Sequence, residues 1–144
     1  MKKIYLLIAL LFAAWTTSFA QCGKKLVIVS SKTEHLDAQG AITRTDDEKA
    51  TVTITKTEIS IAVADAGGSH EMKGTIKSDT CNWTAAYKEG KTVIKADITG
   101  MNGEEKPVTI TITGTGGKVI LLFEIDGEPG DDIRVTADKF EEAA

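Results

Sequence analysis

The stretch TVTITKTEISIAV, residues 51–63, decides the fold class because it contains two runs of alternating apolar and polar side chains. In each run, residues 51–55 and 58–63, every second side chain falls on one apolar face. The apolar positions are Val52, Ile54, Ile59, Ile61 and Val63. A period of two, with threonine and serine opposite, is typical of antiparallel strands that are buried on one side and solvated on the other.

The same alternation recurs along the chain, and residues 107–113 repeat it with Val108, Ile110 and Ile112 on the apolar face. Glycine and asparagine residues mark turns between the alternating runs at short intervals. We therefore expect about ten strands. They cover residues 24–36, 41–46, 50–56, 58–64, 70–77, 81–88, 91–99, 107–113, 118–126 and 132–139.

The short connections predict an all-β protein, because parallel strands would need long crossover segments between them. The expected topology is an antiparallel up-and-down meander of eight to ten strands. An open meander of this length would leave two exposed edges, so we expect it to close into a barrel. A two-sheet sandwich is the alternative architecture.

The number and spacing of the strands resemble the lipocalin and fatty-acid-binding-protein group, which are calycin-like β-barrels that carry apolar molecules. The resemblance covers most of residues 21–144 at the level of architecture. The opening strand contains KKLVIV, residues 24–29, and lacks the Gly-x-Trp signature of lipocalins. The resemblance implies a barrel interior that holds one small apolar ligand.

Residues 1–20, MKKIYLLIALLFAAWTTSFA, have the form of a secretory signal peptide, with two lysines, an apolar run and a Ser18-Phe19-Ala20 cleavage site. Cleavage after Ala20 would leave residues 21–144 as a single lipocalin-like domain. We therefore expect export to the periplasm or the extracellular space. The alternative is a lipid anchor on Cys22, which Gln21 disfavours because lipoprotein signals place a small residue before the acylated cysteine.

Cys22 and Cys81 are the only two cysteines. An even number in an oxidising compartment predicts one disulfide bond. The bond would close a loop of about 60 residues and join the mature N-terminus to the middle of the fold. Acylation of Cys22 would instead leave Cys81 without a partner.

The charge pattern argues against nucleic acid as a partner. Loss of Lys2 and Lys3 with the signal peptide leaves 15 basic and 21 acidic side chains, a net charge of −6. Both signs are mixed along the chain, whereas binding to phosphates needs a clustered basic face. The apolar run of the signal peptide is shorter than the roughly 20 residues of a membrane span, and no later segment approaches that length.

Two sets of apolar side chains are candidate binding residues. Met72, Trp83, Tyr87 and Phe123 lie on expected inward faces and could line a ligand pocket, with core packing as the alternative for the aromatic residues. Ile120 and Leu122 lie on the opposite face of a strand that is apolar on both sides. They need a cover, which the C-terminal segment around Phe140 or a second sheet could supply, or they form an interaction patch.

No residue pattern predicts a cofactor, a metal centre or an enzyme active site. His35 and His70 are far apart, and the glutamates beside them point to the other face of their strands. The loop at residues 126–132 carries four carboxylates that could surround calcium, but it lacks the EF-hand order. We therefore expect a non-enzymatic protein without a cofactor.

Two functions fit this pattern best. The first is a carrier that binds a small apolar molecule inside the barrel, which requires an interior cavity of several hundred Å³. The alternative is an interaction or structural module that acts through an outer apolar face or a sheet edge, with self-association as one expected consequence. An enzyme, with His70 as its candidate histidine, is the third and weakest hypothesis.

Overall fold

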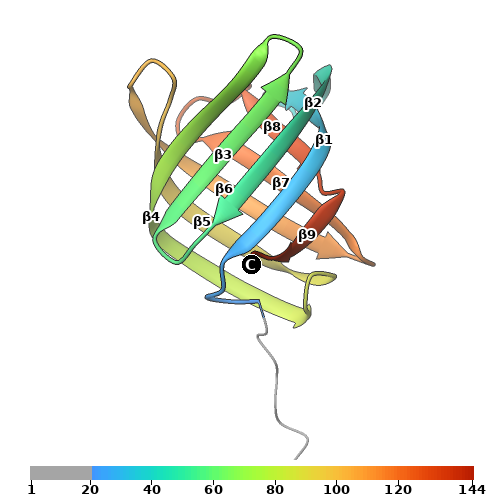
Figure 1. The fold of residues 1–144 in the computed structure, drawn as a ribbon. Coiled ribbons are helices and arrows are strands. Elements are labelled where there is room, and N and C mark those ends of the chain that lie inside the picture. Colours follow the sequence, from blue (N-terminus) through green and yellow to red (C-terminus); the bar gives the residue numbers. More distant parts are fainter. Residues whose placement is uncertain (1–20) are drawn as a thin grey trace, which may run out of the picture.

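The computed structural model describes residues 21–144, and the predicted signal peptide lies outside this part. The described chain forms nine antiparallel strands (Figure 1). They are β1 (Leu26–Leu36), β2 (Ile42–Ile54), β3 (Glu58–Asp65), β4 (Gly68–Ala85), β5 (Glu89–Thr99), β6 (Glu105–Thr115), β7 (Lys118–Ile125), β8 (Asp132–Thr136) and β9 (Lys139–Glu142). None of these described residues belongs to a helix long and apolar enough to cross a membrane.

The strands β1 to β8 pair in chain order and close into a barrel, because β1 pairs with both β2 and β8. The last strand, β9, shares an edge of β1 with β8. Residues Thr33 to Leu36 of β1 pair with β8, whereas Leu26 to Val29 pair with β9. The predicted all-β meander and its closure are therefore confirmed, and the sandwich alternative is not the fold.

Two predicted breaks are absent, because β2 and β4 each run without interruption through segments that we expected to be turns. Each of these places has a shift in strand register. Opposite residues 47–50 of β2, the shift lies in β1 between Ser30 and Lys32, and in β4 it lies between Ile76 and Ser78. Such a β-bulge bends a strand without ending it. The polar runs there lose the alternation of side chains, but the backbone continues to pair.

One predicted strand is two strands in the structure. The chain expected over residues 132–139 divides at Ala137 and Asp138, whose backbone N–H groups donate to the carbonyl oxygens of Val119 and Val29 at 2.9 and 2.8 Å. Ala137 is therefore hydrogen-bonded to β7 and Asp138 to β1, at the point where β8 has ended and β9 begins. Because of this division, β8 and β9 pair one after the other with the same edge of β1.

The apolar faces predicted from the alternation form the core. Val52, Ile54, Ile59 and Ile61 are buried, as is the inward face of β6. The most deeply buried side chains are Ile28, Ile59, Ile94, Ile110, Ile112 and Val108. These residues belong to the core cluster inside the barrel. The lower end of the barrel is the end where β1 begins, and the upper end is the one where β3 joins β4 (Figure 1).

The N-terminal segment closes the lower end. The predicted disulfide is formed between Cys22 and Cys81, with 5.9 Å between the two Cα atoms. Gln21 is fully buried beside it. The aromatic residues of this end pack together, with ring centroids 5.8 Å apart for Trp83 and Phe140 and 5.0 Å apart for Tyr87 and Phe140.

Two glycines make room for the indole of Trp83 at this end. A Cβ atom at Gly90 would lie 2.6 Å from Trp83 Cδ2, and one at Gly114 would lie 2.5 Å from Trp83 Cζ3. Gly114 does not have a positive φ, so glycine is required there by close approach alone, from the Trp83 ring and from the Lys88 carbonyl oxygen, which would lie 2.8 Å from a Cβ atom. The space for the Trp83 ring between Gly90 and Gly114, here called the Trp83 slot, therefore depends on glycine at position 114.

We expect Gly114→Ala to lower the free energy of unfolding by about 1–3 kcal/mol, because the added methyl group displaces the Trp83 ring. Urea denaturation followed by circular dichroism measures the change. Gly100→Ala is the matched control, since its Cβ would have one tight contact, with the Asn102 side chain at 3.1 Å, and an ordinary contact with the Glu104 carbonyl oxygen at 3.7 Å. Equal losses in the free energy of unfolding for the two variants would contradict the prediction that the Trp83 slot requires glycine at position 114.

Candidate functional site

An apolar cavity lies at the upper end of the barrel, away from the disulfide. It has a volume of about 90 Å³. Its apolar walls include Val52, Ile61, Val63, Met72, Phe123 and Ile133. These side chains come from β2, β3, β4, β7 and β8, so barrel closure is what brings them together.

A wider hollow of about 400 Å³ adjoins this cavity. The two spaces share His35, Met72, Phe123 and Ile133. The hollow extends toward Gly100 and Asn102 in the β5–β6 turn and toward Asp131 before β8. The upper end is therefore a small apolar recess beneath a larger mouth.

Thr33 is the polar group of the recess that lacks a partner. The residue lines the cavity and is 4% exposed, and its Oγ1 atom makes no hydrogen bond. A buried hydroxyl without a partner costs about 1–3 kcal/mol. A molecule in the recess that offers one hydrogen-bonding atom would remove this cost.

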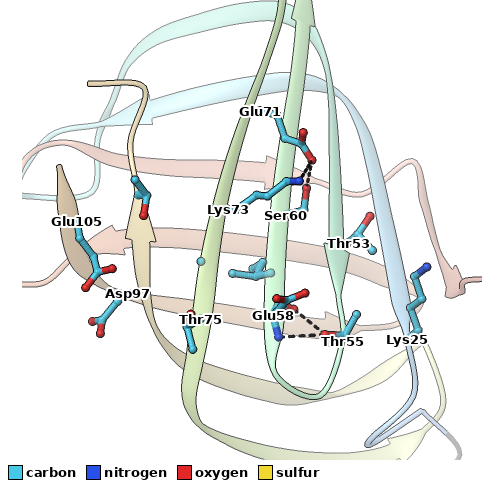
Figure 2. A pocket seen from close by; sticks show the side chains of 13 residues that line it. Lys25, Thr53, Thr55, Glu58, Ser60, Glu71, Lys73, Thr75, Asp97 and Glu105 are labelled. Carbon is cyan, nitrogen blue, oxygen red and sulfur yellow. Dashed lines mark hydrogen bonds and ion pairs between the residues drawn. The ribbon is translucent and has the colours of Figure 1, made fainter. Parts of the chain in front are cut away.

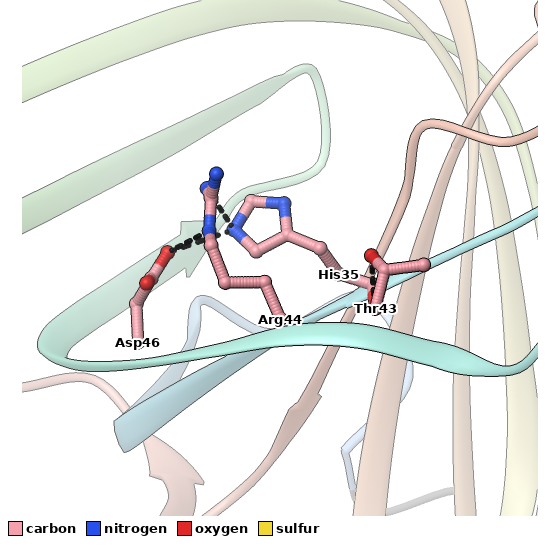
Figure 3. A network of polar contacts seen from close by, with 4 residues as sticks. All are labelled: His35, Thr43, Arg44 and Asp46. Atoms are coloured by element: carbon pink, nitrogen blue, oxygen red, sulfur yellow. Dashed lines mark hydrogen bonds and ion pairs between the residues drawn. The ribbon is translucent and has the colours of Figure 1, made fainter.

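His35 sits at the boundary between recess and mouth in a polar network with β2 (Figure 3). His35 Nε2 lies 3.1 Å from Asp46 Oδ2 and 2.8 Å from Arg44 Nη2. The Arg44 Nε–H donates to the same Asp46 oxygen at 2.9 Å. The role of Nε2 depends on the tautomer, because an Nε2 atom without a proton accepts from Arg44 and an Nε2–H group donates to Asp46.

The rim of the mouth carries more negative than positive groups. Glu48, Glu104 and Asp131 line the two spaces together with one cation, Lys106. The Lys106 ammonium donates to both carboxylate oxygens of Glu128, at 2.9 and 3.0 Å. These hydrogen bonds raise the pKa of Lys106 above its usual value, against the lowering effect of desolvation.

The structure brings two of the four predicted pocket residues together. Met72 and Phe123 line both the recess and the mouth. Trp83 and Tyr87 lie at the other end of the barrel, where Trp83 is 4% exposed and its Nε1–H donates to Thr92 Oγ1 at 2.7 Å. The nominated His70 is exposed and lines neither space.

The sequence interpretation missed Thr33 and His35 because of the bulge in β1. Strict alternation from the buried Ile28 would turn residues 33 and 35 outward. The register shift between Ser30 and Lys32 reverses the phase, so that Thr33 and His35 face the interior. The residue types of Ser30, Ser31 and Lys32 do not predict this register shift.

The predicted outer patch is half-buried and is flanked by polar neighbours. Ile120 pairs across the sheet with Thr113 and Thr136, and Leu122 pairs with Thr111 and Arg134. Phe140 does not cover it, because Phe140 pairs with the inward-facing Ile28 and packs on Trp83 and Tyr87. Residues 21–144 contain no second sheet that would cover it.

A polar hollow of about 370 Å³ lies on the outer surface of β2 to β5 (Figure 2). Glu71 in this hollow accepts a hydrogen bond from Ser60 at 2.7 Å and pairs with Lys73 at 3.7 Å. Asp97 pairs with Lys77 at 2.9 Å. Internal pairing of this kind is typical of a solvated surface.

The described residues include no group of three or more His, Cys, Asp or Glu side chains that could hold a metal ion. In the loop at residues 126–132, Asp126 lies 3.5 Å from Lys95 and Glu128 pairs with Lys106. Lysine ammonium groups therefore neutralise two of the four carboxylates that could have surrounded calcium.

Comparisons of the chain with protein-family models, with curated proteins and with solved structures found no match. The closed antiparallel barrel is compatible with a calycin-like architecture, and this likeness concerns the fold alone. The chemistry of the upper end is therefore the main indication of function.

Proposed function

We propose that this chain is an exported, non-enzymatic binding protein that holds a small apolar molecule at the upper end of its barrel. The observation that carries the proposal is the apolar recess lined by Met72 and Phe123, which contains the unpartnered hydroxyl of Thr33. Binding sites for small molecules are typically concave and mostly apolar, with a few polar groups that orient the ligand. The recess has both properties.

The volumes limit the ligand. An engineered apolar cavity of about 150 Å³ accommodates benzene, so the recess of about 90 Å³ holds a short alkyl group or a similar fragment. The rest of the molecule would lie in the adjoining mouth of about 400 Å³. Isoleucine and valine side chains fill the centre of the barrel, where we had expected an interior cavity of several hundred Å³. The ligand would therefore sit at the end of the barrel instead.

The polar groups limit its chemistry. Thr33 favours a ligand with one hydrogen-bonding atom close to its apolar end. The carboxylates Glu48, Glu104 and Asp131 disfavour an anion, since like charges repel. A neutral molecule with one hydroxyl or carbonyl group fits these conditions.

The alternative is an interaction module that acts through Ile120 and Leu122 on the outer face. The observation in its favour is that no other element of the described chain covers these two side chains. It predicts dimers in sedimentation analysis that disappear in Ile120→Ser. The closed barrel weakens the version based on a sheet edge, because each of β1 to β8 has a partner strand on both sides over part of its length and the described sheet ends at the four-residue β9.

Titration with a neutral fluorescent probe, N-phenyl-1-naphthylamine, tests the binding proposal. We expect Val63→Trp to weaken probe binding at least about tenfold, because the indole overfills the recess and projects into the mouth where the probe would lie. A tenfold loss corresponds to about 1.4 kcal/mol of binding energy. The matched control is Ile120→Ser, which changes an outward side chain and should bind like the unmodified protein. Circular dichroism verifies that both variants fold.

Two further measurements define the ligand. Thr33→Val should retain probe binding, because the rings of the probe are too large for the recess and would lie in the mouth. The same substitution should weaken binding of the natural ligand. Native mass spectrometry of the exported protein should show that ligand as a co-purifying molecule. Equal probe binding by Val63→Trp and the unmodified protein would exclude the recess as the site.

A further inference from the structure

Gln21 is a fully buried polar residue whose amide is only half satisfied. It is 0% exposed and lies next to the disulfide-bonded Cys22. Its Oε1 atom accepts a hydrogen bond from the backbone N–H of Tyr87. Its Nε2 atom is buried and has no hydrogen-bond partner.

The orientation of this amide follows from its neighbour. Exchanging the oxygen and nitrogen atoms would place an NH₂ group against the Tyr87 N–H, and two donors cannot share a hydrogen bond. The Nε2 atom is therefore the group left without a partner. A buried NH₂ group in this state destabilises the folded protein.

The predicted cleavage after Ala20 would make Gln21 the first residue of the mature protein. We propose that Gln21 is a modification site and that it cyclises to pyroglutamate after cleavage. The α-amino nitrogen attacks Cδ, the N–Cδ bond forms and the Cδ–Nε2 bond breaks. Nε2 leaves as ammonia with a proton from the α-amino group, so the reaction needs no oxidant and no co-reactant.

The product suits this position better than the unmodified residue in two respects. The lactam has lost the unpartnered Nε2 atom but keeps a carbonyl oxygen that can accept from Tyr87. It also removes the positive charge that a free α-ammonium group would bring to a buried residue. The disulfide argues against the lipid-anchor alternative, because the Cys22 sulfur is bonded to Cys81 and is not free for acylation.

Intact-mass spectrometry of the full exported protein tests the proposal. We expect the mass of residues 21–144 with the disulfide formed, lower by one ammonia. After unfolding and reduction, pyroglutamyl aminopeptidase should remove the first residue, whereas a general aminopeptidase should not. Gln21→Ala is the matched control, because it should show the full mature mass and remain open to a general aminopeptidase.

A second comparison measures the effect on stability. Protein that retains Ala20 in front of Gln21 cannot cyclise, and we expect its melting temperature to be about 3–8 °C lower. A mature protein that keeps the ammonia and is digested from its first residue would overturn the proposal. Nε2 would then need a water molecule in the adjacent cavity of about 120 Å³. A different first residue would overturn the predicted cleavage and the proposal with it, but would leave ligand binding at the upper end intact.

Discussion

Removing the disulfide with Cys22→Ser and Cys81→Ser together is expected to lower the free energy of unfolding by about 4 kcal/mol. The two cysteines are 59 residues apart in sequence, so the bond restricts a long loop of the unfolded chain. The loss is large for a domain of this size, whose total stability is of the order of 5–15 kcal/mol. The N-terminal segment would also lose its covalent attachment to β4.

Urea denaturation of the double variant and of the reduced, alkylated protein measures this loss. Both should unfold at a lower urea concentration than the oxidised protein, and by similar amounts. The double variant should still bind N-phenyl-1-naphthylamine, because the recess lies at the other end of the barrel. Similar midpoints for the reduced and oxidised proteins would show that the bond contributes little to stability.

Trp83→Ala is expected to lower the free energy of unfolding by about 3–5 kcal/mol. The side chain is 4% exposed and packs against Phe140 with ring centroids 5.8 Å apart. Its removal leaves a cavity over Gly90 and Gly114, whose backbones lie too close to the ring for any side chain of their own. It also deprives the buried Thr92 hydroxyl of its indole donor.

Thermal and urea unfolding followed by circular dichroism check this prediction, since the variant has no tryptophan in residues 21–144 to serve as a fluorophore. Trp83→Phe is the graded control, because it keeps a ring in the slot but loses the hydrogen bond. We expect it to cost less than half as much. A Trp83→Ala loss below about 1 kcal/mol would mean that the lower end repacks.

The fold was largely predictable because each strand alternates strongly between a buried and a solvated face. The hairpin of β2 and β3 shows this most clearly, since Val52, Ile54, Ile59 and Ile61 are buried as their spacing predicts. The strand ends were less predictable. The polar residues 46–49 show no alternation, yet their backbone continues β2 because pairing depends on main-chain groups.

The candidate site was predictable only in part. Met72 and Phe123 follow from alternation within their own strands. Thr33 and His35 face the recess because a bulge reverses the phase of β1, and no local residue pattern indicates that bulge. Trp83 shares a strand with Met72 but is 11 positions further along β4, so it lies at the opposite end of the barrel.

The sequence by itself determined that the chain forms an antiparallel meander and which faces of its strands are buried, because a period of two is a local property. It also determined that Cys22 and Cys81 pair if they are oxidised, since the chain has no other cysteine. Tertiary structure alone decided that the centre of the barrel is filled and that the open space lies at its upper end. Which side chains meet across a barrel depends on register, on bulges and on closure through β1, and these arise from contacts between distant strands.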